Sequence, residues 1–320
     1  MGRTFHEMQD ITAVKLSTDP IFQKYYESKP QLIVASHHEM RNPNNYSPLF
    51  RVILKSFTFG SFEDFPSISN RENQLIFDDW EDLLWKKTVI VPYVDVQPEV
   101  QINSPKTPYK DDEIRPIDLY FVGQYDLRPA YKTRRDLSEI LKGQAFDDLK
   151  IIYAQQFGTD EEATRYQDYS KEACDVKACL KTFSCIDCAM PKDYMSNYAY
   201  TFFLSKAKFH IVPKGETPSN SRVYDSLSCG VIPIILSDYL SEVALPFKSV
   251  IPWEDLLTFV PMELSDPAMI KAFRHVLDTP EEILADKRRL IEIFKDDVSW
   301  TSENSRVVEN IINEVLRKEI

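Results

Sequence analysis

Long apolar runs are missing from this chain. No stretch holds about 18 consecutive apolar residues, the length that a membrane-spanning helix needs. The first residues, from Met1 to Glu7, also lack the apolar core of a signal peptide. As numbered, the chain is therefore predicted to make no membrane contact.

Positive charge is scarce as well. The chain has 38 Lys and Arg residues against 50 Asp and Glu residues, a formal net charge of −12. A nucleic-acid partner requires a net basic face that neutralises phosphates, so this class of function is excluded. A local basic site for one small diphosphate is compatible with the same composition.

Cysteine is rare and unevenly distributed. Four of the five cysteines fall close together, at Cys174, Cys179, Cys185 and Cys188. The Cys-x2-Cys spacing of the last two is half of a common zinc site, but two disulfides or free thiols also fit the sequence. None of these states implies catalysis. The polar segment 158–193 around them is predicted to be an insertion, and Cys229 is predicted to pack in the core.

The first hundred residues are typical of a small α/β domain. Residues 13–28 carry apolar side chains at helical spacing. Short apolar runs predict buried strands at 32–35, 51–54 and 88–91. The Pro-rich, acidic stretch 95–115 has few apolar residues, which is the composition of an exposed linker.

Strands and helices alternate beyond this linker. The predicted strands are 117–123, 149–153, 209–212 and 231–236, and the predicted helices are 129–142, 194–206 and 221–229. Such alternation predicts a parallel sheet with covering helices. Three helical patterns, broken at Pro280 and near Trp300, complete the chain. The predicted domains are residues 1–110, residues 111–300 and a C-terminal helix at 301–320.

The segment from Pro213 to Pro233 carries the strongest functional signal. It reads as a strand, a polar loop, a helix, a glycine stop and another strand. Ser219, Asn220 and Ser221 are all residue types that favour the N-cap of a helix. The free N–H groups and the positive dipole end of such a helix favour an anion.

The side chains around this predicted helix start suit a pyrophosphate. Gly215 permits close approach of the backbone to a ligand, and Lys214 and Arg222 supply two cations. Asp225 lies one helical turn after Arg222, where its carboxylate can accept hydrogen bonds from ribose hydroxyls. The alternative is that Arg222 and Asp225 form a surface ion pair at i, i+3 spacing.

This segment resembles the C-terminal signature of the exostosin family of glycosyltransferases. The matching stretches are Ser205 to Gly215, Ser219 to Arg222, Cys229 to Ile234, Asp238, and Leu245 to Trp253. Upstream, Phe121 to Gly123 and the later Arg134 resemble a further family element, so residues 117 to 300 are covered well. The N-terminal half matches more weakly, at 33–39 and 91–93, and His38 stands where the family has Asp.

The resemblance implies a GT-B fold, in which two Rossmann-like domains face a cleft. Donor nucleotide binds the C-terminal domain, acceptor enters from the N-terminal domain, and the anomeric centre is inverted. The implied donor-binding residues are Gly123, Arg134, Pro213, Lys214, Gly215, Ser219, Asn220, Ser221, Arg222 and Asp225.

An inverting transfer needs a general base and stabilisation of the leaving diphosphate. His37, His38 and Glu39 are the candidates for the base, because they follow the carboxyl end of a predicted strand. The chain has no Asp-x-Asp triplet, the usual carboxylate pair that holds a divalent cation against a diphosphate. Metal independence is therefore predicted, with no cofactor and with the UDP-sugar as co-substrate.

The combined prediction is an inverting glycosyltransferase that moves a sugar from a UDP-sugar of the xylose, galactose or glucuronic acid type to a glycan hydroxyl. Its expected partners are the UDP-sugar and an oligosaccharide or glycan acceptor. The alternatives are a catalytically inactive protein that binds nucleotide sugars or glycans, and an interaction module organised by zinc at the cysteines. The expected location is cytoplasmic as numbered, or the Golgi lumen if the chain is a trimmed domain.

Overall fold

The chain divides into two compact units. A computed structural model describes residues 14–15, 17–25, 31–34, 57–62, 88–95, 115–124, 131–157, 182, 185–191, 197–215, 218, 220–237, 240–262 and 264–318. The first unit takes in Met1–Pro92, Glu242–Phe247 and Val307–Ile320, and the second takes in Tyr93–Ser241 and Lys248–Arg306. Residues 93–110 thus belong to the second unit and the last helix to the first. The functional division into 1–110, 111–300 and 301–320 stays a prediction.

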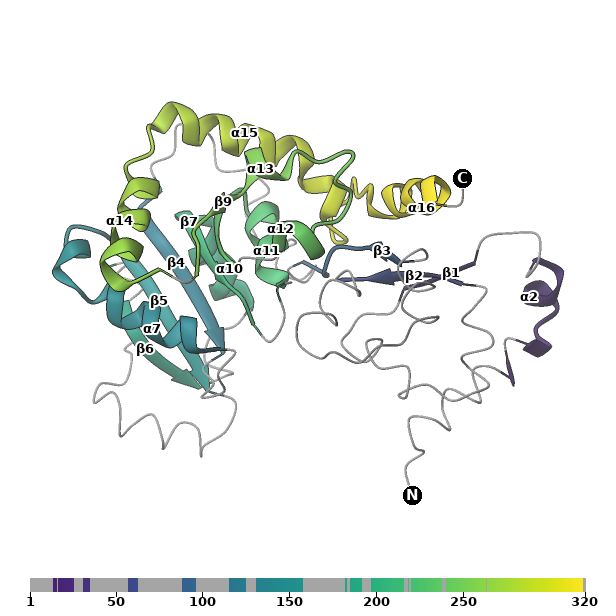
Figure 1. Cartoon of the computed structure of the whole chain (residues 1–320), viewed down its shortest axis with the longest axis horizontal. Helices are drawn as coiled ribbons and strands as arrows, with labels where there is room; N and C mark the ends of the chain where they lie inside the picture. Colours follow the sequence, from purple (N-terminus) through teal and green to yellow (C-terminus); the bar gives the residue numbers. More distant parts are fainter. Residues whose placement is uncertain are drawn as a thin grey trace, which may run out of the picture. The chain divides into compact units, whose positions relative to one another are not determined.

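The first unit contains a parallel sheet in the order β1–β2–β3 (Figure 1). Its strands are β1 (Gln31–Val34), β2 (Phe57–Ser61) and β3 (Thr88–Ile90). The predicted strands at 32–35 and 88–91 are confirmed as β1 and β3, whereas the run at 51–54 lies outside the described residues. The pattern of apolar runs missed β2, whose sequence Phe-Thr-Phe-Gly-Ser lacks an aliphatic run.

Two helices of this unit are described. Within the predicted helix at 13–28, the structure has the shorter α2 (Pro20–Tyr25). The last helix, α16 (Val307–Lys318), packs against β3. Val307, Ile311 and Val315 form its buried face, which explains the helical spacing of the C-terminal apolar residues.

The second unit is built on a six-stranded sheet whose described pairs are all parallel, in the order β6–β5–β4–β7–β8–β9. Its strands are β4 (Ile117–Gln124), β5 (Ile151–Phe157), β6 (Cys185–Pro191), β7 (Ala207–Pro213), β8 (Ile232–Leu236) and β9 (Thr258–Phe259). The four strands predicted for this region are confirmed as β4, β5, β7 and β8. Their near-continuous burial is the pattern of central strands covered on both faces.

The two edge strands, β6 and β9, were missed. The prediction of an insertion over 158–193 is wrong for its last part, because Cys185–Pro191 pairs with β5 and extends the sheet. Its sequence, Cys-Ile-Asp-Cys-Ala-Met-Pro, has a single β-branched residue and so gives little strand signal.

Helices connect the strands and cover the sheet. They are α7 (Lys132–Leu141), the 3-10 helix η4 (Gln144–Phe146), α10 (Asn197–Ser205), α11 (Ser221–Ser228), α12 (Leu240–Val243), α13 (Trp253–Leu256), α14 (Asp266–Leu277) and α15 (Glu281–Val298). The predicted breaks at Pro280 and near Trp300 are confirmed, since α14, α15 and α16 flank them. Among the described residues, no helix has the length and apolarity to cross a membrane.

Opposite faces of the sheet are covered by α7 and α10. Tyr120 and Phe121 are neighbours in β4 and so point to opposite faces. Tyr120 donates a hydrogen bond of 3.1 Å to the backbone of Tyr200 in α10. Phe121 stacks on Tyr153, whose hydroxyl donates a bond of 2.6 Å to the carbonyl of Arg134 in α7. The side chains that pack between sheet and helices therefore fix both layers.

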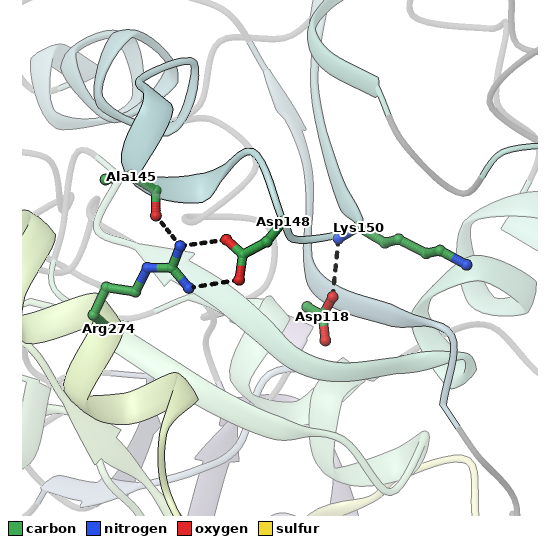
Figure 2. A network of polar contacts seen from close by, with 5 residues as sticks. All are labelled: Asp118, Ala145, Asp148, Lys150 and Arg274. Atoms are coloured by element: carbon green, nitrogen blue, oxygen red, sulfur yellow. Dashed lines mark hydrogen bonds and ion pairs between the residues drawn. The ribbon is translucent and has the colours of Figure 1, made fainter.

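Charged contacts fasten α14 near the amino ends of β4 and β5 (Figure 2). Arg274 in α14 pairs with Asp148 and donates to the carbonyl of Ala145. The backbone N–H of Lys150 donates to Asp118 Oδ2 at 2.9 Å. The hydrogen bonds from Arg274 hold the pKa of Asp148 below its usual range. This network lies at the amino ends of these strands, opposite the loop between β7 and α11.

Candidate functional site

The loop after β7 is closed by the N-cap of α11. Asn220 has an extended backbone, and its Oδ1 accepts a hydrogen bond of 3.1 Å from the N–H of Arg222. Its Nδ2 donates at 2.9 Å to the carbonyl of Pro213, the last residue of β7. Of the predicted cap candidates, Asn220 is the cap, Ser221 is the first helical residue, and Ser219 lies outside the described residues. The amide of Asn220 thus joins both ends of the loop.

The far end of α11 is a Schellman-type stop. Gly230 has a positive φ of 66°, its N–H donates to Leu227, and the N–H of Val231 donates to Ser226. A residue with a Cβ is strained at such a φ, which explains the glycine here. The chain can therefore turn directly into the buried β8.

Arg222 is held against the carboxyl end of β4. Its Nε donates to the carbonyl of Val122 at 3.1 Å, and its Nη1 donates to Asn220 Oδ1 at 3.3 Å. The guanidinium carbon lies 5.4 Å from the centroid of the Phe121 ring. These contacts restrain a long side chain before any ligand arrives, which reduces the entropy cost of binding.

Gly123 makes this placement possible. A Cβ at this position would lie 2.5 Å from Phe121 Cζ and 2.8 Å from Arg222 Nη2, distances that real Cβ atoms essentially never show. Any side chain here would displace the aromatic ring or the guanidinium. The glycine at the end of β4 is therefore required for the position of Arg222.

Arg134 reaches the same place from α7. Its side chain is buried, its Nη1 donates to the carbonyl of Gln124 at 3.3 Å, and its guanidinium carbon lies 5.9 Å from the Phe121 centroid. A Cβ on Gly215 would lie 3.4 Å from Arg134 Nη2. The predicted residues Arg134, Gly215 and Arg222 are therefore brought together around Phe121.

This edge of the sheet is positively polarised. Two guanidinium groups stand beside the N-terminus of α11, where the helix dipole adds partial positive charge. Lys214 is partly exposed next to Gly215, and its backbone N–H donates to Leu236 at 3.0 Å. Bidentate guanidinium groups and helix N-termini both favour phosphate oxygens. The arrangement can therefore hold a diphosphate.

Asp225 accepts a hydrogen bond from a neighbouring helix. The hydroxyl of Tyr200 in α10 donates to Asp225 Oδ2 at 3.1 Å. Arg222 in turn donates to Val122 and Asn220. These contacts engage Asp225 with α10 and turn Arg222 toward β4, which differs from a simple surface ion pair between the two. The role of Asp225 at a ribose stays a prediction.

A buried histidine connects β7 to α11. His210 Nδ1 lies 2.7 Å from Ser226 Oγ, and Ser226 Oγ donates to the carbonyl of Arg222 at 2.6 Å. The serine proton is used in that bond, so Nδ1 of His210 carries the hydrogen. Burial, followed by the charge of Arg222, holds the pKa of His210 well below its ordinary value of 6.5. Within the described residues, its Nε2 has no hydrogen-bond partner.

The candidate bases lie outside the described residues. This applies to His37, His38 and Glu39, which follow β1 along the chain. Of the cysteine cluster, Cys174 and Cys179 are also outside, while the backbones of Cys185 and Cys188 belong to β6. No group of three or more metal-ligating side chains occurs in the part of the chain that the structure describes.

Comparison with known proteins assigns the family. The profile of the Exostosin GT47 domain matches residues 52–272, which is more than half of the chain. The chain therefore belongs to the exostosin GT47 family of glycosyltransferases. The resemblance of residues 213–233 to this family is confirmed.

Individual relatives match at low identity. An exostosin-1 homolog of Caenorhabditis elegans is 21% identical over 259 residues, which are 76% of this chain and 57% of that protein. A probable β-1,4-xylosyltransferase of Arabidopsis thaliana is 30% identical over 102 residues, 31% of this chain and 23% of that protein. The chain thus spans less than two thirds of the length of either relative.

Solved structures share the fold. OtsA without ligand superposes with a TM-score of 0.54 at 11% identity, over 99% of this chain and 77% of that chain. An α-glucosyltransferase in complex with UDP gives a TM-score of 0.53 at 9% identity, over 96% of this chain and 77% of that chain. These are GT-B glycosyltransferases, so the predicted GT-B fold class is confirmed. At such low identity the likeness shows the fold alone.

Proposed function

We propose that this chain transfers a sugar from a UDP-sugar to a hydroxyl of a glycan, with inversion and without a metal ion. The observation that carries the proposal is the convergence of Arg134 and Arg222 beside the N-terminus of α11. Membership of the exostosin GT47 family supports transfer chemistry. The names of relatives, a xylosyltransferase and several glucuronosyltransferases, point to uronic acid or pentose donors.

The chain's own residues supply the chemistry at the leaving group. As the bond between the anomeric carbon of the sugar and the diphosphate oxygen breaks, negative charge grows on the diphosphate oxygens. Arg134, Arg222 and the N–H groups of α11 stabilise that charge, and such preorganised groups act most strongly in the transition state. Lys214 adds a further cation at the partly exposed end of the loop. This positive set performs the role that a divalent cation has in metal-dependent enzymes.

The remaining binding contacts follow from the same loop. The backbone that approaches the diphosphate is that of Pro213, Gly215, Ser219, Asn220 and Ser221. Gly123 leaves room for the side chain of Arg222. Asp225 accepts hydrogen bonds from the ribose. The first domain, residues 1–110, supplies the acceptor side, and the second, residues 111–300, the donor side.

The general base is the third part of the proposal. An acceptor hydroxyl must lose its proton as it attacks the anomeric carbon, and His37, His38 or Glu39 takes it. Loss of the true base lowers turnover by about 100-fold or more and spares donor affinity. Replacements of the other two residues have smaller effects on turnover.

The test is a transfer assay with the purified chain, a panel of UDP-sugars, oligosaccharide acceptors and a chelator. We expect UDP release and an acceptor product of inverted configuration with one donor. His37→Ala, His38→Ala and Glu39→Gln then identify the base, with Arg289→Ala on the exposed face of α15 as a control that retains turnover. Donor binding without any product would instead favour an inactive binding protein. Product formation that requires a divalent cation would contradict the metal-free mechanism.

A further inference from the structure

A group of aromatic and polar side chains lies beneath α11. Tyr120 from β4, Tyr200 from α10 and His210 from β7 approach one another, with ring centroids 5.6 to 6.3 Å apart. The hydroxyl of Tyr200 points to Asp225 on α11 and donates to it. The group therefore connects the sheet, α10 and the helix that carries the donor-binding residues.

Tyr200 is itself held in place. The hydroxyl of Tyr120 donates to the backbone carbonyl of Tyr200 at 3.1 Å, and Tyr120 is fully buried. The ring of Tyr200 also contacts the rings of Tyr120 and His210. Restraint of both backbone and ring fixes the direction from which the phenol approaches Asp225.

The phenol can act only as a donor toward Asp225. Burial, followed by the negative charge of Asp225, raises the pKa of Tyr200 well above its ordinary value of 10.0, so the hydroxyl keeps its proton at neutral pH. An ionised carboxylate is an acceptor with about four lone-pair sites on its two oxygens. The bond from Tyr200 occupies one of these sites on Oδ2 and orients the carboxylate.

Asp225 stands next to the diphosphate side of the site. It follows Arg222 by one helical turn, so the two side chains emerge on one side of α11. In a nucleoside diphosphate, the ribose adjoins the diphosphate. A carboxylate one turn from the phosphate-binding arginine is therefore positioned for the ribose hydroxyls.

On the basis of the proposed function, we infer that Tyr200 is a positioning residue that orients the Asp225 carboxylate toward the ribose of a nucleoside diphosphate. The consequence is selection of ribonucleotides over nucleotides without ribose hydroxyls. Hydroxyl groups that pair with a charged acceptor give strong discrimination, because an analogue that lacks them leaves the acceptor unpaired. A carboxylate that changes rotamer freely would discriminate less.

The experiment compares two ligands by calorimetry: UDP and 2′,3′-dideoxyuridine diphosphate, which lacks both ribose hydroxyls. The wild-type chain is expected to bind UDP about tenfold or more tightly than the dideoxy analogue. Tyr200→Phe is expected to reduce that ratio to about threefold or less, mainly through weaker UDP binding. Its affinity for the dideoxy analogue stays near the wild-type value.

Ser205→Ala is the matched control, because it also removes one hydroxyl from α10, but this hydroxyl donates within the helix to the carbonyl of Phe202 at 2.9 Å, whereas that of Tyr200 donates to Asp225. The control is expected to keep the wild-type ratio. An unchanged affinity ratio in Tyr200→Phe, including an equal loss of affinity for both ligands, would show a merely structural role and overturn the inference.

Asp225→Asn keeps the inference falsifiable if Tyr200→Phe does not fold. If Asp225→Asn keeps the wild-type ratio of affinities for UDP and the dideoxy analogue, the inference is overturned, because the carboxylate would not bind the ribose hydroxyls. If the wild-type chain binds both ligands with equal affinity, the inference is overturned and the proposed function still stands. Absence of UDP binding to the wild-type chain would remove both.

Discussion

Replacement of Gly123 by alanine tests how the donor-binding arginine is placed. The added methyl group would lie 2.5 Å from Phe121 Cζ and 2.8 Å from Arg222 Nη2. Phe121 is fully buried and stacks on Tyr153 with ring centroids 4.7 Å apart, so the ring has little room to move. We expect the guanidinium of Arg222 to yield instead.

The size of the effect follows from the contacts that are lost. Displacement of Arg222 weakens its bond to the carbonyl of Val122, now 3.1 Å long, and misdirects the guanidinium from the diphosphate. A hydrogen bond to a charged group is worth about 1.5–3 kcal/mol, which corresponds to about a 10- to 150-fold loss of UDP affinity. Overpacking next to Phe121 adds about 1–3 kcal/mol of destabilisation.

Calorimetric titration with UDP measures the first quantity, and urea unfolding measures the second. Gly143→Ala is the matched control: its Cβ would lie 3.1 Å from the carbonyl of Ile140, in the turn after α7, away from the arginines. This control is expected to bind UDP as the wild type does. A folded Gly123→Ala chain with unchanged UDP affinity would refute the placement of Arg222.

Three further predictions concern stability and reactivity. His210 titrates below its ordinary pKa of 6.5 in the folded chain, so the unfolded chain takes up the extra proton first, and the free energy of unfolding falls below pH 6.5 by up to about 1.4 kcal/mol per pH unit. Urea unfolding between pH 7 and 5 should show a shallower decline for His210→Asn, and an equal decline would contradict the burial of a neutral histidine. Asp95 is buried and accepts hydrogen bonds from Ser299, Thr301 and other donors, so Asp95→Ala should lower the free energy of unfolding by about 3 kcal/mol or more. In the same urea assay Asp286→Ala, at an exposed ion pair, should cost less than about 1 kcal/mol, and a similar loss in both variants would argue against the network. Burial raises the pKa of Cys229 to about 12, so iodoacetamide at pH 8, mapped by mass spectrometry, should leave this thiol unmodified until urea unfolds the chain; rapid labelling of the folded chain would contradict it.

Local signals in the sequence predict the central part of the site. Cap-forming residue types identify the start of α11, and Gly230 identifies its end, because both features depend on residues close in sequence. The continuous apolar runs predict β4, β7 and β8 for the same reason. Gly123 and Arg134 come from the family resemblance, since no local pattern connects them to a loop ninety residues later.

Buried polar partners could not be predicted in this way. Tyr200 and Asp225 are 25 residues apart, and His210 and Ser226 are 16 apart, so only the packing of α10 and β7 against α11 pairs them. One signal was present: His210 is a titratable residue inside the otherwise apolar run from Phe209 to Val212 of β7, and a buried polar side chain needs a hydrogen-bond partner. The edge strands β6 and β9 give a weak strand signal, because β6 has a single β-branched residue and β9 is two residues long.

The most direct test of the central claim is calorimetric titration of the chain and of Arg222→Ala with UDP, both in the presence of a chelator. We expect micromolar binding to the wild type without metal, and a loss of about 30-fold or more in Arg222→Ala, on the order of 2–4 kcal/mol. Equal binding of UDP by both proteins would place the donor elsewhere. Absence of binding to the wild type, with or without a divalent cation, would contradict the metal-free donor site.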